Sequence, residues 1–192
     1  MAKRRKKRRW FEKLVLLFFL VGTVGVLILF FKDEFAHLLH PKPKQKRLLE
    51  ETREVVLYFS DEKGEFLVGE RRKIAKRGDP IEEGKELVKE LIRGPRGGLL
   101  PTLPPKTRCL SLRLNEKGVA SIDFDRTLLK DHPGGSSAEI LTAYSIVHSL
   151  TQNFPQIKQV QILIEGKPVE TIAGHLSLKH PLTAKPDLMG KQ

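Results

Sequence analysis

Asp131, His132 and Ser136 supply the residue types of a hydrolase triad within one short stretch of this chain. In such a site Ser136, or its neighbour Ser137, would act as a nucleophile activated by His132, and the side chains would have to approach within about 2.6–3.2 Å. Triads are recognised by geometry, and the G-x-S-x-G turn that presents the serine in many hydrolases does not occur here. We therefore favour a solvated loop over a site that acts on wall or ester substrates.

The two glycines before Ser136 raise the chemistry of anion binding, because backbone N–H groups at a helix start attract phosphate. Phosphate-binding loops add a lysine or a longer glycine pattern, whereas here Ser, Ala and Glu follow, and the glutamate repels anions. We predict a structural cap instead, in which Ser136 accepts a hydrogen bond from the backbone near Glu139 and the glutamate bonds back. The residues of this predicted cap are Gly134, Gly135, Ser136 and Glu139.

The histidines and the cysteine do not combine into a metal or redox site. His148, His175 and His180 lack the spacing of metal ligands and have no cysteine or acidic cluster beside them. We expect His148 to border the solvent-facing side of a helix and His175 to hydrogen-bond within a turn. Cys109 is the only cysteine, so no disulfide can form within the chain, and it is interpreted as a small strand residue. The sequence predicts no catalytic residue, no metal and no cofactor.

A basic segment, ERRKIAKR at residues 70–77, is the candidate interaction surface outside the N-terminus. Its cations are Arg71, Arg72, Lys73, Lys76 and Arg77. Such a cluster attracts lipid headgroups, anionic wall polymer or an acidic partner. It is equally typical of a solvated strand, in which Lys and Arg discourage unwanted pairing at a sheet edge. Both interpretations stay open on the sequence alone.

The net charge of +12 is concentrated at the N-terminus, where residues 1–13 carry eight Lys and Arg against the single Glu12. Residues 14–31 follow without a charge and are long enough for a helix of about 27 Å in a hydrocarbon layer of about 30 Å. We predict one transmembrane helix, with the basic stub 1–13 in the cytoplasm and all later residues on the far side. The basic run beside an apolar span favours membrane topology over nucleic-acid binding.

The predicted location is therefore the bacterial inner (cytoplasmic) membrane, with a periplasmic or otherwise extracytoplasmic C-terminal part. A cleaved signal peptide is the main alternative, but the sequence KDEFAHLLHPK after the apolar run has no small-x-small cleavage pattern. The charged, proline-containing residues 32–54 are predicted to form a tether. A folded domain is expected over residues 55–182 and a flexible tail over residues 183–192.

Hydrophobic periodicity within that domain predicts strands and helices in the order ββαββαββ. The first hairpin turns at Gly64, and the first helix starts with Asp79 as a structural N-cap and Pro80 in its first position. A second hairpin, CLSLRLNEKGVASIDFD, is expected to place its leucines on one face. The helix over residues 136–154 should be the main core helix. The expected fold class is α+β, a mainly antiparallel sheet covered by two helices.

Several segments resemble a known family in both their residues and their order along the chain. They are TLPPKTRCLSLRLNEKGVASIDF at residues 102–124, GGSSAEILTAYSIVHSLTQNFPQIKQVQILIEGKPVETIAGH at residues 134–175, and LSLKHPL at residues 176–182. Together they resemble the GerMN domain of spore-germination and sporulation proteins. The resemblance implies a fold similar to ring-building domains of envelope complexes and carries over no catalytic residue. Relatives in spore envelopes are often lipoproteins or carry two copies, whereas this chain is predicted to place one copy on a transmembrane anchor.

The predicted function is a non-catalytic extracytoplasmic interaction or assembly module on a single membrane span, related to the envelope, sporulation or germination. Its expected partners are an envelope protein or further copies of the chain, bound through sheet edges and the basic strand. The alternative is a binder of cell-wall polymer or another anionic envelope ligand, held by Arg71, Arg72, Lys73 and the proline-rich loop that follows the first helix. Nucleic acid is not an expected partner.

Overall fold

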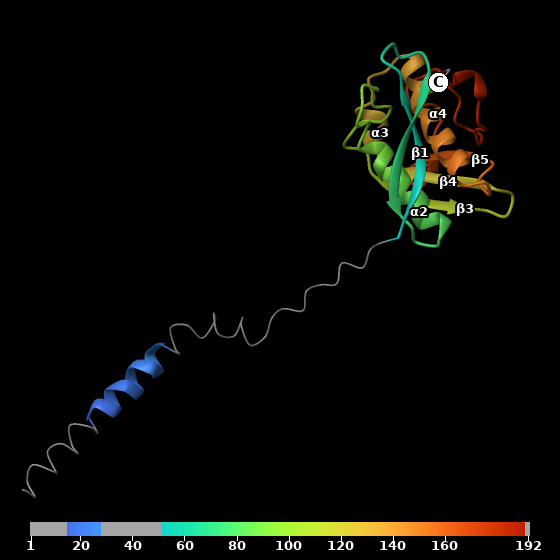
Figure 1. The fold of residues 1–192 in the computed structure, drawn as a ribbon. Helices are drawn as coiled ribbons and strands as arrows, with labels where there is room; N and C mark the ends of the chain where they lie inside the picture. The colour runs from blue at the N-terminus through green and yellow to red at the C-terminus, as the bar shows by residue number, and fades with distance from the viewer. Residues whose placement is uncertain (1–14, 28–50, 191–192) are drawn as a thin grey trace, which may run out of the picture. The chain divides into compact units, whose positions relative to one another are not determined.

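The computed structural model describes residues 15–27 and 51–190 of the 192-residue chain (Figure 1). The chain divides into two compact units, Met1–Leu49 and Glu50–Gln192. The predicted basic stub 1–13 lies outside the described residues, as does the greater part of the predicted tether, residues 32–50.

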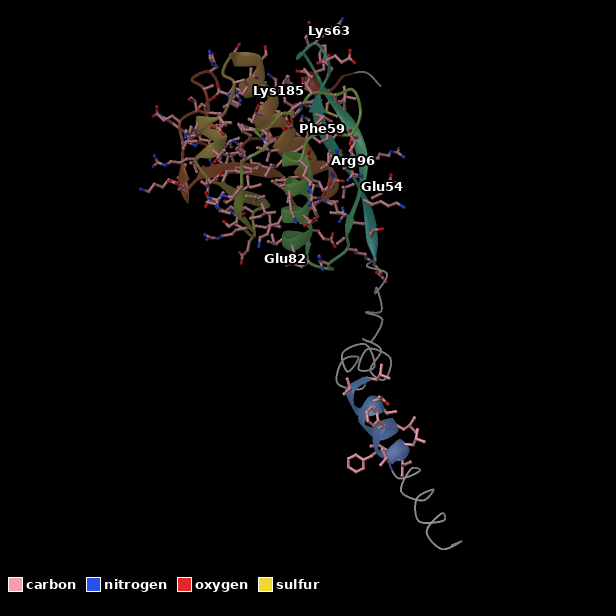
Figure 2. All side chains as sticks on the ribbon, turned by 90° about the vertical axis from the view of Figure 1, so that its left-hand side faces the viewer. Glu54, Phe59, Lys63, Glu82, Arg96 and Lys185 are labelled. Atoms are coloured by element: carbon pink, nitrogen blue, oxygen red, sulfur yellow. The ribbon has the colours of Figure 1, made fainter. Side chains whose placement is uncertain are left out.

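In the first unit, residues 15–27 form a helix whose side chains are all exposed. Large apolar side chains such as Leu16, Phe18 and Phe19 project from it, and Figure 2 shows side chains standing out around the helix. The predicted membrane span covers residues 14–31, of which Leu14 and residues 28–31 lie outside the described residues. Over residues 15–27 and 51–190, no helix combines the length and the apolar character that crossing a bilayer requires.

The second unit is an α+β domain, as predicted. Strands β1 (Thr52–Ser60) and β2 (Leu67–Ala75) form a hairpin, and helix α2 (Pro80–Ile92) follows. A second hairpin consists of β3 (Cys109–Leu114) and β4 (Val119–Phe124). The remaining elements are α3 (Thr127–Lys130), α4 (Ser136–Asn153), β5 (Gln159–Ile164), β6 (Lys167–Pro168) and the 3-10 helix η1 (Pro186–Leu188). The predicted order is therefore present, with the short helices α3 and η1 in addition.

The strands form two sheets, whereas the sequence predicted a single and mainly antiparallel one. The β1–β2 hairpin is a sheet by itself, and the second sheet has the order β3-β4-β5-β6. Strands β4 and β5 run parallel, with Val119 opposite Gln159 and Phe124 opposite Ile164. The cause is their connection, because a helical crossover returns the next strand parallel to the first. This strand–helix–strand pattern is visible in the sequence.

Helix α2 begins at a side-chain cap and approaches β3 closely. The Ile81 N–H donates to Asp79 Oδ1 at 3.0 Å, and Pro80 occupies the first turn, where an N–H has no helical partner. Gly84 stands where the helix meets the sheet, since a Cβ there would lie 2.5 Å from Leu112 Cδ2. Glycine therefore allows the short distance between α2 and β3.

Helix α4 pairs with the free edge of β1. The Tyr58 N–H donates to Ser149 Oγ at 3.0 Å, and the Val56 N–H donates to Asn153 Oδ1 at 2.9 Å. The Asn153 side chain also donates to the Val56 carbonyl at 2.7 Å. Where the strand ends, Ser60 exchanges two backbone hydrogen bonds with Leu100. The outward backbone groups of β1 are thus occupied at three alternate positions.

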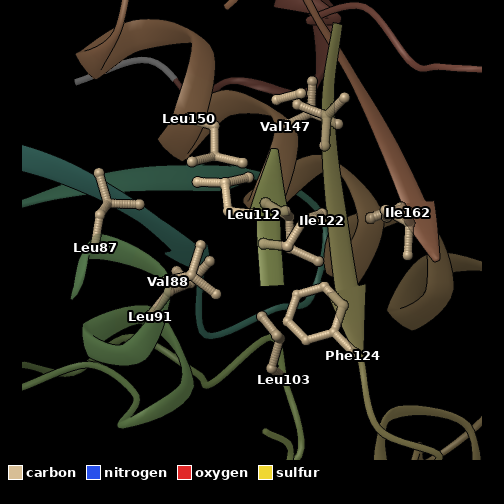
Figure 3. Packing of buried hydrophobic residues seen from close by; sticks show 14 of the residues in the cluster. Leu87, Val88, Leu91, Leu103, Leu112, Ile122, Phe124, Val147, Leu150 and Ile162 are labelled. Atoms are coloured by element: carbon tan, nitrogen blue, oxygen red, sulfur yellow. The ribbon is translucent and has the colours of Figure 1, made fainter. Parts of the chain in front are cut away.

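One hydrophobic core joins the helices to both sheets (Figure 3). Buried side chains of α2 and α4 meet those of β3, β4 and β5 in its centre, and the inward residues of β1 extend it. The labelled members in Figure 3 are Leu87, Val88, Leu91, Leu103, Leu112, Ile122, Phe124, Val147, Leu150 and Ile162. Burial of this apolar surface is the main favourable contribution to folding.

The leucines of β3 do not share one face as predicted. Leu112 is buried, but Leu110 is 49% exposed. The register shifts between Cys109 and Ser111, so Leu110 is the extra residue of a bulge and turns outward. Alternation in a single strand carries no signal of a bulge, which depends on the partner strand.

The domain extends beyond the predicted bounds at both ends. Residues 52–54, placed in the predicted tether, belong to β1, because Thr52 pairs with Ala75. Within the predicted flexible tail, residues 183–190 pack on the domain: His148 Nε2 lies 3.1 Å from the Lys185 carbonyl, and the Gly190 N–H donates to the Leu67 carbonyl at 2.9 Å. The tail contacts were missed because they join residues far apart in sequence.

Candidate functional site

Arg72, a member of the predicted basic patch, is buried at 4% exposure and does not face solvent. Its guanidinium lies 2.6 Å from Glu70 Oε1 and 3.2 Å from Glu90 Oε2, and it donates to the Gly94 carbonyl at 2.6 Å. It also lies over the Phe59 ring, 5.4 Å from the centroid. These partners supply the counter-charges that a buried cation requires. Arg72 therefore joins β2 to α2 and is removed from the predicted interaction surface.

Arg71 and Lys73 lie exposed on β2, opposite Val56 and Glu54 of β1. Because Val56 directs its backbone groups toward α4, its partner Arg71 directs its own groups to the opposite border of the hairpin. Among the described residues, the backbone hydrogen bond on this border of β2 is the one that the Gly190 N–H donates to the Leu67 carbonyl. We call the border from Gly69 to Lys73 the β2 edge; it is basic, and no backbone of residues 15–27 or 51–190 pairs with it.

Lys76 and Arg77 occupy the turn after β2. Lys76 Nζ lies 3.1 Å from Glu51 Oε2, an exposed pair. The N–H groups of Arg77 and Gly78 both donate to Glu83 Oε1 at 3.0 Å, and Arg53 bonds the other oxygen at 2.8 Å. Burial alone would raise the pKa of Glu83, but these hydrogen bonds and the Arg53 charge lower it.

A groove of about 700 Å³ lies between α2 and the segment that leads into β3. Two glutamates in its lining, Glu82 and Glu86, are outnumbered by cations. The cations are Arg77, Lys85, Lys89, Arg93 and Arg108. We call this surface the α2 groove. It shares only Arg77 with the basic patch predicted from the sequence.

The cations of the α2 groove have acidic neighbours of their own. Lys85 Nζ lies 2.7 Å from Glu82 Oε1, and Arg108 Nε lies 2.9 Å from Asp125 Oδ2. Lys89 pairs with Glu86, and Arg93 with Glu90, one helical turn away. The pairs of Lys85 and Lys89 are largely exposed and contribute about 0–1 kcal/mol each, so an incoming anion can replace them at small cost, whereas Arg93 and Arg108 pair with the buried carboxylates of Glu90 and Asp125.

The floor of the groove includes apolar and uncharged groups. Ile92, Pro105 and Cys109 line it. Burial raises the pKa of the Cys109 thiol to about 11, so the thiol is neutral at pH 7 and offers an apolar contact. Thr107 also lines the groove, and its buried hydroxyl has no hydrogen-bond partner among the described residues. A buried unpaired hydroxyl costs roughly 1–3 kcal/mol, which makes it uncommon in native proteins.

Glu139 is fully buried and does not form the predicted capping box. Its carboxylate accepts hydrogen bonds from the N–H groups of Ile172, Ala173 and His175 at 2.7, 2.9 and 2.7 Å. Helix α4 starts at Ser136 after Gly135, without a side-chain cap hydrogen bond. Burial would raise the pKa of Glu139, but the backbone hydrogen bonds lower it overall. Glu139 therefore fixes a distant loop, which its local pattern did not indicate.

Gly134 and Gly135 both adopt positive φ, at 82° and 87°, as a sharp entry into α4 requires. The two nitrogens of His132 are engaged, Nε2 with Thr142 Oγ1 at 3.0 Å and Nδ1 with the Gly134 N–H at 3.0 Å. In the part of the chain that the structure describes, no hydrogen bond joins His132 to Ser136 or Ser137. The triad geometry is not assembled there.

His148 is buried, whereas the sequence predicted that it would border the solvent-facing side of its helix. Its ring contacts Tyr58 and Tyr144, and burial lowers its pKa. His175 Nδ1 lies 3.2 Å from Glu139 Oε2. Among the described residues, no group of three or more His, Cys, Asp or Glu side chains is arranged to hold a metal ion.

Part of the α2 groove has a sequence signal. Lys85, Lys89 and Arg93 recur every four residues, which places them along one side of a helix at steps of about 6 Å. Arg108 and Thr107 have no such signal, because they reach the groove only through packing of the proline-rich loop against α2.

The family comparison matches residues 56–170 to Germane, described as sporulation and spore germination. This match lies within residues 55–182, where the folded domain was expected, and it overlaps the segments that carry the resemblance. A comparison with curated proteins found no match.

Solved structures have a similar fold. A candidate lipoprotein from Clostridium perfringens is 26% identical, with a TM-score of 0.52 over 74% of this chain and 95% of that one. The first GerMN domain of the sporulation protein GerM from Bacillus subtilis is 20% identical, with a TM-score of 0.55 over 71% of this chain and all of that one. The tandem GerMN domains of GerM from Bacillus subtilis are 19% identical, with a TM-score of 0.55 over 79% of this chain and 51% of that one.

Proposed function

The chain belongs to the Germane family of sporulation and spore germination, and from this membership we propose a non-catalytic extracytoplasmic module that binds envelope proteins or further copies of itself. The module is anchored in the bacterial inner membrane, with its N-terminus in the cytoplasm. Its process is related to the cell envelope, sporulation or germination.

The observation that carries this proposal is the asymmetry of the β1–β2 hairpin. Backbone groups of β1 are paired with α4 and with Leu100, whereas the β2 edge is unpaired and exposes Arg71 and Lys73. An unpaired edge is a template for a strand from another chain. Its cations favour partners with acidic residues beside the added strand.

The membrane anchor rests on the exposed apolar helix over residues 15–27 and on the uncharged sequence 14–31 around it. Exposed leucine and phenylalanine side chains on all sides of a helix require an apolar environment. The likeness to a candidate lipoprotein is consistent with an extracytoplasmic domain held at a membrane.

A photocrosslinking amino acid at position 73 of the full chain tests the proposal in native membranes. We expect adducts with an envelope protein or with the chain itself from position 73, and none from position 117, an exposed residue of the β3–β4 turn. Protease added to intact spheroplasts should digest the domain. A lack of adducts at position 73, or full protection from the protease, would contradict the proposal.

Wall polymer is the second candidate ligand, because Arg71 and Lys73 are exposed where the sequence predicted a basic strand. Arg72 belongs to the fold and must be left unchanged in any test. The test measures how much of the full chain purified wall retains. Wall polymer would be favoured over a protein partner if the variant R71E/K73E is no longer retained and position 73 yields no protein adduct.

A further inference from the structure

We propose that the α2 groove is a second binding surface, which holds an extended acidic peptide segment of a partner protein. It is separate from the β2 edge, and it rests on the proposed function only in that the partner is a protein. Arg77, Lys85, Lys89, Arg93 and Arg108 would contact carboxylates, while the apolar floor would contact the peptide's other side chains.

Positive charge is concentrated in the lining of the α2 groove. Residues 51–192 carry 22 Lys and Arg against 19 Asp and Glu, an excess of three. The lining of the groove has five cations and two glutamates, which is the same excess. Outside the groove, the charges of residues 51–192 balance. An acidic ligand is therefore attracted here more strongly than to the average surface of the domain.

The spacing of the cations fits an extended chain. Lys85, Lys89 and Arg93 follow one another at steps of about 6 Å along α2. Alternate side chains of an extended peptide are about 6.7 Å apart and project to the same side. Acidic residues at alternate positions would thus meet successive cations, and the intervening residues would turn away.

The groove is not shaped for charge alone. Ile92, Pro105 and the neutral Cys109 give it an apolar floor, which suits peptide side chains better than a chain of phosphates. The unpaired Thr107 hydroxyl offers a hydrogen bond to a peptide group once the groove wall adjusts. Residues 32–50 of the chain itself are not such an acidic segment, since they carry five Lys and Arg against three Asp and Glu.

The first test measures binding of a fluorescent ten-residue peptide, in which glutamate alternates with valine, to the full chain in detergent. In the variant K85Q/K89Q/R93Q we expect Kd to rise about tenfold, the combined effect of three exposed charge contacts. The matched control K63Q/R113Q/K117Q removes the same charge at exposed residues outside both the groove and the β2 edge, and its Kd should stay within about twofold. Circular dichroism of both variants checks that the fold is retained.

Equal weakening in both variants would overturn the proposal, because binding would then follow net charge alone. A synthetic polyglycerol phosphate provides a second comparison. If it binds more tightly than the peptide and the groove variant loses that binding, the groove is a polymer site and the proposal is overturned. A crosslinker at position 89 gives a second readout. We expect its adducts to contain acidic peptides; adducts at position 73 with none at position 89 would leave the proposed function standing and remove this inference.

Discussion

Glu139 joins the start of α4 to the loop over residues 172–175 through a buried carboxylate. Three backbone N–H groups and the His175 ring point to its two oxygens. Hydrogen bonds to an ionised acceptor contribute more than those between neutral groups, and a buried charge is tolerated only when so paired. The Glu139 side chain therefore holds residues 172–175 against the start of α4.

The variant E139Q should lose about 2–3 kcal/mol of unfolding free energy, because an amide replaces one acceptor oxygen with a donor that faces N–H groups. The folded-state pKa of Glu139 is lowered, so its contribution is present above the unfolded pKa of about 4.3 and is lost as pH falls through the folded pKa. Urea unfolding should show that the difference in unfolding free energy between E139Q and the native chain becomes smaller below about pH 4. The variant E170Q, at an exposed glutamate paired with Lys179, serves as control and should unfold at the same urea concentration as the native chain.

At the scale of the element, α2 has two faces with separate tasks. One face packs Leu87, Val88 and Leu91 into the core, and the other presents the lysines of the α2 groove. Gly84 controls how closely the first face approaches β3.

Replacing Gly84 with alanine sets two opposed effects against each other. Alanine improves helix propensity by about 1 kcal/mol, but the new methyl meets the buried Leu112 at 2.5 Å, and overpacking costs about 1–3 kcal/mol. We expect thermal unfolding to show a net loss of about 1 kcal/mol in the free energy of unfolding. The cost of G84A should be smaller when it is measured as the difference between L112V and G84A/L112V, because the shorter valine leaves room for the new methyl; an equal cost in both backgrounds would place the cause elsewhere. The variant G97A, with open space at its Cβ, is the neutral control.

At the scale of the whole domain, the C-terminal segment connects elements from both sheets. Leu182 pairs with Val160 of β5, Lys185 contacts His148 of α4, and Met189 forms a bridge to Leu67 of β2. Figure 2 shows Lys63 of the β1–β2 turn and Glu82 of α2 at opposite ends of the domain. The contacts of Leu182, Lys185 and Met189 make this segment part of the folded domain.

A chain that stops after Leu182 should unfold at a temperature about 5 °C lower or more, because it exposes the cluster of Tyr58, Leu67 and Leu141 and leaves His148 without its partner. The measurement is thermal unfolding followed by circular dichroism. The variant D187N, at an exposed residue of the same segment, should leave the midpoint within about 1 °C. An unchanged midpoint in the truncated chain would show that the segment adds no stability.

The predictable part of this structure is local. Periodicity indicated both hairpins, α2 and α4, and Asp79 with Pro80 marked a helix start that the structure contains. The parts that sequence reasoning missed depend on distant partners: the burial of Arg72 against Glu90, the bonds of Glu139 to residues 172–175, and the packing of residues 183–190. The α2 groove lies between these cases, since its helical lysines were visible and Arg108 was not.

The pairing of β1 with α4 has a consequence for stoichiometry. A hairpin with one occupied and one open border can accept a single additional strand. Two copies that join through their β2 strands would form a two-fold symmetric dimer in which each open border is used by the other. Such a contact is closed, so neither a ring nor a filament can grow through it, and any larger ring of these domains must use a different, head-to-tail surface.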